Sequence, residues 1–209
     1  MELDDQKQQR RYSPKIRRGM ILDKAAEIIN EEGISNLTME RISRNADISK
    51  SLMYKYFDSL TDLLKELLDR ELSALRNLQF KAAERAVTFE DLVSNITHEY
   101  LTYIHSRGLI IERLQAEPSV TGLHDPTDFG RSAAVKYLAP IVSKTFHIPI
   151  ELAEATTDIS FGLPSAAGHF LLRGHMTVSE VEKLTTKMII GTLNVVRDEY
   201  FVREKELVR

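Results

Sequence analysis

Cysteine is absent from this sequence, and glycine and proline are scarce, with nine and six residues among 209. A chain without cysteine has no disulfide, no thiolate metal site and no cysteine nucleophile, and it suits a reducing compartment such as the cytosol. Hydrophobic residues make up 43% and charged residues 28%, which excludes a disordered or collagen-like chain. No apolar run approaches the roughly 18 residues that span a bilayer, so we expect neither an export signal nor a membrane segment.

The charges are unevenly distributed along the chain. Residues 7–57 hold eleven Lys and Arg against six Asp and Glu, a balance of +5, whereas residues 58–209 hold seventeen against twenty-two, a balance of -5. A basic region next to an acidic one suggests that only the N-terminal part faces a polyanion.

Helical periodicity begins near residue 15. Apolar residues then recur on one helical face, at Ile21, Leu22, Ala25, Ile28 and Ile29. Gly33 follows the last of them and is expected to end this helix in the left-handed conformation. Thr38 is expected to cap a second helix that reaches about residue 46, and Ser49 a third that reaches about residue 56.

A longer helix is predicted next. The serine-x-x-acid pattern of Ser59 and Asp62 is expected to cap it, and it continues to about Glu84, a length of about 40 Å at about 1.5 Å per residue. We therefore expect a flexible basic arm over residues 1–14, a small three-helix domain over 15–58 and a larger helical domain over 59–209, with the helix 59–84 connecting the two domains.

Three short helices, of which the last two are joined by a tight turn, form a helix-turn-helix, whose last helix lies in the major groove of DNA. The predicted third helix would present hydroxyl, ammonium and phenol groups to phosphates and base edges. Leu52 on this helix has two open interpretations, contact with a thymine methyl or packing in the core. Arg10, Arg11, Lys15, Arg17 and Arg18 precede the motif and favour phosphate contact as a group, although a solvated face explains any one of them equally well.

Order and spacing of these residues resemble the N-terminal domain of the TetR family of bacterial transcription regulators, over about residues 15–65. The matching positions are Ile21-Leu22, Ala25-Ala26, Gly33, Thr38, Ile42, Ala46, Ser49 and Tyr54-Lys55-Tyr56-Phe57. The family usually has glycine in the turn where Asp47 stands, and Asp accepts left-handed backbone better than most residues, so we expect the turn to survive. The residues predicted to contact DNA are Arg17, Thr38, Ser49, Lys50, Ser51, Tyr54, Lys55 and Tyr56.

Beyond Thr88 five further amphipathic helices are predicted, at 89–106, 109–117, 128–146, 150–172 and 178–203, with a kink near Pro164 in the fourth. The chain is thus expected to be all-α, with about nine helices. The last helix is apolar on two stripes, one of Val181, Leu184, Met188 and Val195 and the other of Ile189, Leu193, Val196 and Tyr200. One neighbouring domain covers only part of such a helix, so a second subunit is predicted.

The resemblance implies that the last two helices pair with their copies in a four-helix bundle. The predicted dimer interface comprises Gly162, Ala166, Leu184, Met188, Gly191 and Val195. A homodimer would carry two recognition helices related by a two-fold axis and would bind a roughly palindromic operator. The resemblance also implies a location in the bacterial cytosol, at the nucleoid when DNA is bound.

In the family the larger domain usually encloses a cavity for a small molecule. Residues that could line it here are Ile96, Tyr100, Tyr103, Leu114, Phe129, Phe161 and His169, and ordinary core packing is the alternative for each. Such a lining implies a largely apolar effector that releases a repressor from its operator.

Sequence motifs for catalysis and metal binding are missing. His98-Glu99 begins like a zinc-protease motif, but Thr102 stands where the second histidine belongs. There is no Gly-rich phosphate loop and no nucleophile elbow. We therefore expect no catalytic residues, no metal, no cofactor and no enzyme activity, and we keep two rival hypotheses: an all-helical protein-interaction module without DNA affinity, and a helical-bundle enzyme.

Overall fold

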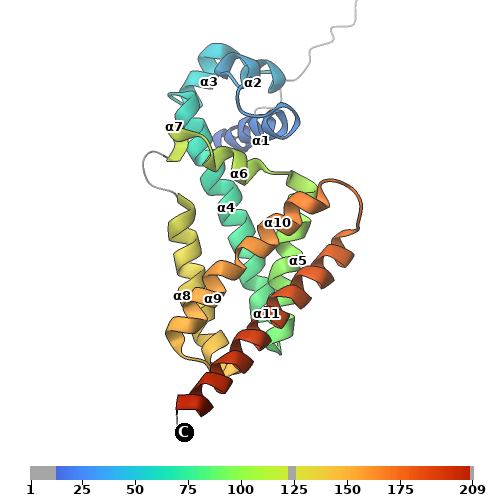
Figure 1. Ribbon diagram of the computed structural model, residues 1–209. Coiled ribbons are helices and arrows are strands. Elements are labelled where there is room, and N and C mark those ends of the chain that lie inside the picture. The colour runs from blue at the N-terminus through green and yellow to red at the C-terminus, as the bar shows by residue number, and fades with distance from the viewer. Residues whose placement is uncertain (1–12, 122–125, 208–209) are drawn as a thin grey trace, which may run out of the picture. The chain divides into compact units, whose positions relative to one another are not determined.

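The computed structural model describes residues 13–121 and 126–207, and within them all regular structure is helical. The helices are α1 (Pro14–Glu32), α2 (Met39–Asn45), α3 (Lys50–Tyr56), α4 (Leu60–Glu84), α5 (Phe89–Arg107), α6 (Ile110–Gln115), α7 (Pro118–Thr121), α8 (Pro126–Phe146), α9 (Ile150–Ser160), α10 (Gly162–Leu171) and α11 (Val178–Leu207). The chain forms two compact units that divide within α4, between Leu67 and Leu68 (Figure 1). Apart from Ser13 and Pro14, the predicted basic arm lies outside the described residues.

The N-terminal unit contains the three predicted short helices. Helix α1 ends at Gly33, whose φ of 82° is readily accessible to glycine. The hydroxyl of Thr38 accepts a hydrogen bond from the Arg41 amide at 3.1 Å, and that of Ser49 accepts one from the Leu52 amide at 3.2 Å. These interactions begin α2 and α3 where the sequence predicted them, because each N-cap satisfies an amide that has no partner within the helix.

Apolar side chains on the inner faces of α1, α2, α3 and the first turns of α4 form the core of this unit. Those with at most 2% of their surface exposed include Ile21, Ile29, Ile42, Met53, Phe57, Leu63 and Leu67. Between α2 and α3, Asp47 has a φ of 52°, so the turn does use the left-handed conformation at the position where glycine is usual.

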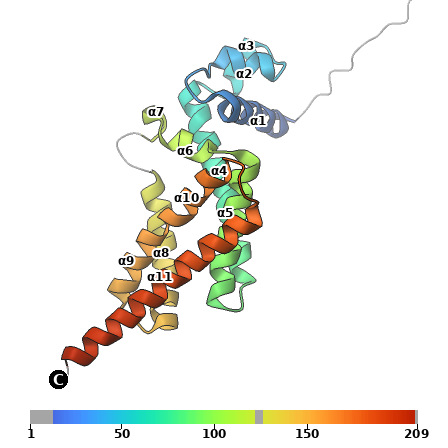
Figure 2. The same cartoon turned by 45° about the vertical axis from the view of Figure 1, so that its right-hand side comes forward.

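In the larger unit α5 packs against α10 and α11, and α8 packs against α9, as both views of the ribbon show (Figures 1 and 2). One core cluster joins α8, α9 and α11 through eight buried residues, Val135, Ala139, Val142, Phe146, Ile148, Ala153, Ile189 and Leu193. A smaller cluster joins α5, α10 and α11 through Leu101, Leu171 and Val181. Val181 shares one predicted stripe of the last helix with Leu184, Met188 and Val195, but it is only 2% exposed, because α11 turns it toward α5 and α10.

Two further details differ from the sequence prediction. The expected helix 150–172 is split into α9 and α10 at Phe161, three residues before Pro164. Pro164 therefore occupies the first turn of α10, where its missing N–H breaks no helical hydrogen bond. A short helix, α7, also forms in the segment expected to be a loop, so the described residues contain eleven helices rather than about nine. Every helix in the described ranges is too short or too polar to span a lipid bilayer.

Candidate functional site

The outer surface of α3 and its N-cap carries the polar groups that the sequence placed there. Its exposed residues are Ser49, Lys50, Ser51, Tyr54 and Lys55. Tyr54 is 43% exposed, and the hydroxyls of Ser49 and Ser51 lie 3.1 Å apart. Met53 and Phe57 face the core, at 0% and 2% exposed, and hold the helix in place. Hydroxyl, phenol and ammonium groups on one exposed helix face are the donors that protein–DNA interfaces use for phosphates and base edges.

Leu52 and Tyr56 lie at the border of this surface. Both are half-buried, so Leu52 is committed neither to the core nor to solvent. Thr38 is exposed, but its hydroxyl already caps α2. Arg17 lies half-buried in α1. The structure thus gathers five of the eight predicted contact residues on the outer face of α3, with Tyr56 at its edge and Arg17 and Thr38 on the neighbouring helices.

Arg18 has a structural role that the sequence did not reveal. Its Nη1 donates to the Tyr56 carbonyl at 2.6 Å and its Nε to Glu66 at 2.6 Å, while the guanidinium lies 4.4 Å from the centre of the Phe57 ring. The hydrogen bonds to Glu66 raise the pKa of Arg18 further above its ordinary value. Arg18 therefore ties α1 to the end of α3 and to the start of α4.

Lys50 is held by an acidic neighbour. Its Nζ lies 2.6 Å from Glu40 Oε1 on α2, and both side chains are more than half exposed. The hydrogen bond with Glu40 raises the pKa of Lys50, and the same bond lowers the pKa of Glu40. The carboxylate of Glu40 thus lies beside the α3 surface, and a phosphate would have to compete with it for Lys50.

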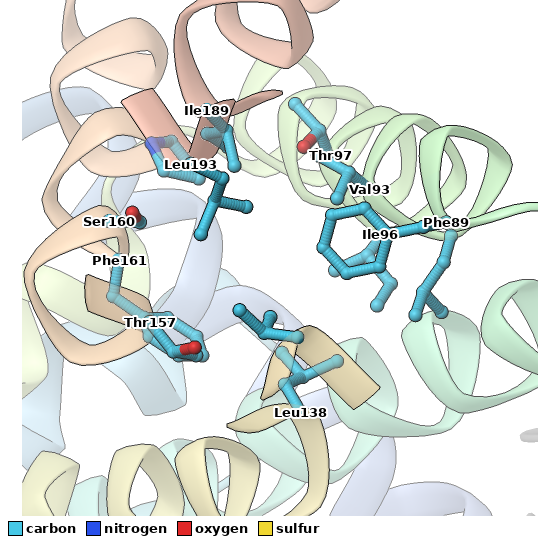
Figure 3. A pocket seen from close by; sticks show the side chains of 13 residues that line it. Phe89, Val93, Ile96, Thr97, Leu138, Thr157, Ser160, Phe161, Ile189 and Leu193 are labelled. Carbon is cyan, nitrogen blue, oxygen red and sulfur yellow. The ribbon is translucent and has the colours of Figure 1, made fainter. Parts of the chain in front are cut away.

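A pocket lies within the larger unit, among α5, α8, α9, α10 and α11 (Figure 3). It contains about 560 Å³ of empty space, a volume that includes its open mouth. Its lining consists of Phe89, Leu92, Val93, Ile96, Thr97, Leu138, Val142, Thr157, Ser160, Phe161, Pro164, Ile189 and Leu193. The only side-chain polar atoms in this lining are the hydroxyls of Thr97, Thr157 and Ser160.

Two of the seven residues predicted to line a cavity, Ile96 and Phe161, do line this pocket. Leu114 is fully buried elsewhere in the unit, and the side chain of Phe129 lies outside the described residues. The sequence missed the lining from α8, α9 and α11. Those residues repeat with the same apolar periodicity as core residues, and no local signal separates a pocket wall from a filled core.

Tyr103, also predicted for the cavity, belongs to a buried ionic network instead. Its hydroxyl donates to Glu71 Oε2 at 2.9 Å, and Arg107 Nε donates to the same oxygen at 3.2 Å. Arg70 donates to the other carboxylate oxygen at 2.8 Å. Burial alone would raise the pKa of Glu71, but the hydrogen bonds from Arg107, Arg70 and Tyr103 outweigh it, and the pKa is lowered. This network fastens α4 to α5 within the larger unit.

Tyr100 and His169 meet at a second carboxylate. His169 Nε2 lies 2.7 Å from Glu112 Oε2, while the Tyr100 and Ser165 hydroxyls donate to Glu112 Oε1 at 3.4 Å each. Burial and then the charge of Glu112 raise the pKa of Tyr100. The cluster joins α5, α6 and α10 and contributes no side chain to the pocket.

The six residues predicted for a dimer interface are all exposed. Leu184, Met188 and Val195 have 50%, 49% and 57% of their surface accessible, an unusual state for large apolar side chains on one helix face. A Cβ added at Gly162 or Gly191 would meet no atom within 4 Å, so nothing within the chain requires glycine there.

His98, the residue of the incomplete zinc motif, bonds through Nδ1 to Glu182 Oε2 at 2.7 Å. Within the described ranges, no group of three or more His, Asp and Glu side chains is arranged to hold a metal ion.

The fold and the α3 surface define a class: an all-α protein whose N-terminal unit is a helix-turn-helix domain. Residues 21–67 match the family model for "Bacterial regulatory proteins, tetR family". The helix-turn-helix of this chain therefore belongs to the TetR family.

Two curated relatives and a solved structure show the extent of the likeness. The chain is 33% identical over 79 residues to the HTH-type transcriptional regulator BetI of Rhizobium meliloti (strain 1021), covering 38% of this chain and 39% of the relative. It is 35% identical over 83 residues to BetI of Agrobacterium fabrum (strain C58 / ATCC 33970), covering 40% of each. The match thus spans about two fifths of the curated relatives' length.

The likeness to solved structures extends over most of the chain. A TetR-like transcriptional regulator from Rhodococcus sp. RHA1 superposes with a TM-score of 0.73 at 18% identity, covering 88% of this chain and 98% of that one. The all-helical fold of this TetR-like regulator is therefore shared beyond the helix-turn-helix, at low sequence identity.

Proposed function

We propose that the protein is a sequence-specific, DNA-binding transcriptional regulator that acts as a repressor on a palindromic operator and is released by a small, largely apolar effector. The observation that supports this most strongly is the exposed α3 surface, in which hydroxyls, Tyr54 and Lys55 stand on a rigid helix of a TetR-type helix-turn-helix. In this proposal α3 enters the major groove, and the protein works on the chromosome in the bacterial cytosol.

The exposed apolar face of α11 supports a homodimer. Leu184, Met188 and Val195 lie on one side of the helix, and Gly162 and Ala166 of α10 provide small residues that permit close approach. Pairing α10 and α11 with their copies would bury this face and give two α3 helices related by a two-fold axis, as a palindromic operator requires.

The pocket of the larger unit supports release by an effector. A ligand shifts a conformational equilibrium only by its difference in affinity for the two states. The effector would therefore bind more tightly to a conformer in which the two α3 helices are spaced incorrectly for successive major grooves. This conformer would have low operator affinity, which is the behaviour of an inducible repressor.

The proposal is tested by selecting bound sequences from a randomised duplex library and measuring affinity for the enriched duplex by fluorescence anisotropy at several salt concentrations. We expect log K to fall with log salt by about 0.9 per phosphate neutralised. Lys55→Ala and Tyr54→Ala should each weaken binding at least tenfold, since each removes a group that contacts phosphate or base edges. Lys136→Ala and Tyr137→Ala are matched controls, because these neighbours form a similar exposed Lys–Tyr pair on α8.

A library that enriches no sequence, or equal effects of the α3 and α8 variants, would contradict the proposal. Folded protein with no affinity for any duplex would favour the interaction-module hypothesis. If the operator complex forms and neither α8 control variant weakens it, the result would support regulation by DNA binding.

A further inference from the structure

We propose that the pocket of the larger unit takes an uncharged, hydrophobic molecule with a single hydrogen-bonding group, and that the hydroxyl of Thr157 is the residue that selects for this group. This inference rests on the effector pocket proposed above and specifies its ligand class. Three features of the structure support it: the absence of charge from the pocket wall, the state of the Thr157 hydroxyl, and the contrast with neighbouring hydroxyls on α9.

None of the thirteen side chains that line the pocket is ionisable. Ten of them are aliphatic or aromatic, and Figure 3 shows Phe89, Val93, Ile96 and Leu138 on the α5 and α8 side facing Phe161, Ile189 and Leu193. A buried carboxylate or ammonium group needs a charged partner or several hydrogen bonds, and this wall offers neither. The interior therefore favours a neutral ligand.

Thr157 supplies one of the three hydroxyls in the pocket wall. The side chain lines the pocket, the residue is only 6% exposed, and Oγ1 has no hydrogen-bond partner. A buried hydroxyl without a partner is unfavourable, because it has lost its bonds to water and gained none in return. A ligand hydroxyl, carbonyl or ether oxygen in the pocket would supply the missing bond, since a threonine hydroxyl can both donate and accept.

Other hydroxyls on α9 do have hydrogen-bond partners, so the lack of a partner at Thr157 is particular to that residue. Thr156 Oγ1 donates to the Leu152 carbonyl at 2.7 Å, and Ser160 Oγ donates to the Thr156 carbonyl at 2.7 Å. Both use the carbonyl four residues earlier, which is the usual solution for a hydroxyl on a helix. Thr157 makes no such bond, so its hydroxyl remains available to a molecule in the pocket.

Thr186 on α11 provides a matched control. It is 5% exposed and its Oγ1 also has no partner, but it does not line the pocket. Replacing either threonine with valine removes a buried, unpaired hydroxyl at nearly constant volume, so both variants should fold and be as stable as the parent or slightly more stable. Only the change at Thr157 should alter the binding of a polar ligand.

The experiment uses the full chain and the uncharged fluorescent probe N-phenyl-1-naphthylamine, which suits a protein without tryptophan. The probe is displaced by three ligands with the same ten-carbon chain: 1-decanol, decanoate and decyltrimethylammonium, each below its micellar range. We expect 1-decanol to bind at least about tenfold more tightly than either ion, because only the alcohol enters without burying a charge. Thr157→Val should weaken 1-decanol about three- to tenfold, the effect of one neutral hydrogen bond.

Thr186→Val should leave the affinity for 1-decanol unchanged, and Thr157→Ser, which keeps the hydroxyl, should retain most of it. The inference is overturned if either ion binds as tightly as the alcohol, or if Thr157→Val and Thr186→Val have the same effect. It is also overturned if neither the probe nor the alcohol binds to the folded protein.

Failure of this inference can be distinguished from failure of the proposed function. If 1-decanol binds with the expected pattern but does not release the operator duplex, the ligand class is supported and the repressor mechanism fails. If the operator complex forms and only a charged compound dissociates it, the regulator proposal stands and the inference about a neutral ligand fails.

Discussion

Glu40 places a negative charge next to the residues proposed to approach DNA. Its carboxylate lies 2.6 Å from Lys50 Nζ, and both groups are exposed to solvent. Exposed ion pairs contribute little to stability, so the main consequence of this pair concerns binding. A DNA phosphate that binds Lys50 would have to displace Glu40, and the displaced carboxylate would then repel the phosphate.

We therefore expect Glu40→Gln to strengthen DNA binding about two- to fivefold at moderate salt, which corresponds to the loss of one exposed competing pair. The affinity should also fall more steeply with salt, by up to about 0.9 in the log-log slope if Lys50 gains a phosphate. Anisotropy titrations against the selected duplex would measure both changes.

Glu27→Gln is the matched control for this prediction. Glu27 forms another exposed pair of 2.6 Å, with Lys24 on α1. Unchanged or weaker DNA binding by Glu40→Gln, or an equal gain from Glu27→Gln, would show that Lys50 does not contact phosphate.

Glu71 is the buried counterpart of Glu40. It is 3% exposed, and Arg107, Arg70 and Tyr103 surround its carboxylate. Because these partners lower its pKa, the network contributes stability at pH values above the usual glutamate pKa of about 4.3, and the contribution is lost as the pH falls through the lowered pKa.

Glu71→Gln should therefore reduce the free energy of unfolding by about 2 kcal/mol at pH 7, because the half-buried guanidinium groups of Arg70 and Arg107 lose the carboxylate that accepts their hydrogen bonds. The difference from the parent should shrink as the pH is lowered from 5 toward 3. Urea denaturation at several pH values measures this. Glu154→Gln, at an exposed position of α9, should show almost no difference at any pH, and a Glu71→Gln deficit that stays constant with pH would contradict the assignment.

Among the elements, the turn between α2 and α3 sets the direction of the recognition helix. Asp47 occupies it with a φ of 52°, and the amide of Ile48 donates to the Ser43 carbonyl at 3.0 Å. Side chains other than Gly, Asn and Asp are strained in this conformation, because Cβ crowds the following carbonyl.

Asp47→Ala should accordingly destabilise the protein by about 1 kcal/mol, whereas Asp47→Gly should be neutral or slightly stabilising. Chemical denaturation of the two variants provides the comparison. A turn that tolerates alanine as well as glycine would show that this backbone conformation is not required in solution. DNA affinity should follow the same order, since α3 depends on this turn for its orientation.

Helix caps and helix packing differ in how far they could be predicted. The caps at Thr38 and Ser49 and the stop at Gly33 depend on residues within one helical turn, and the sequence predicted all three. The role of Arg18 depends on Tyr56 and Glu66, which are 38 and 48 residues away along the chain. Charge patterns in a linear sequence do not contain this information.

At the scale of the whole molecule, the proposed assembly depends on the outer face of α11. Met188 lies near the middle of that face, between Leu184 and Val195, and is 49% exposed in the single chain. A two-fold axis near Met188 would bring the Met188 side chains of the two subunits together. A charged residue at this position would therefore occur twice in an apolar interface.

Met188→Glu should weaken the dimer at least about a hundredfold, since it buries two carboxylates without partners. Sedimentation at micromolar concentration should then report the chain mass of 23.9 kDa in place of twice that value. Operator binding should weaken in parallel, because one α3 helix contacts only one half-site.

Tyr137→Glu on α8 is the control, because Tyr137 is another exposed residue with a large apolar surface, 55% exposed, and the charge introduced there should leave the dimer intact. If the parent itself sediments as a single chain, the dimer proposal fails.

The sequence by itself determined the all-helical class, the helix-turn-helix, its caps and the polar face of α3, because these follow from hydrophobic periodicity and from hydrogen bonds between residues three or four positions apart. Only the tertiary structure decided which apolar residues surround the pocket, that Tyr103 and Tyr100 bond to carboxylates, and that Lys50 is paired with Glu40. Each of these outcomes depends on which helices pack together, and residues that face a core, a pocket or a partner have the same apolar pattern until the packing places them.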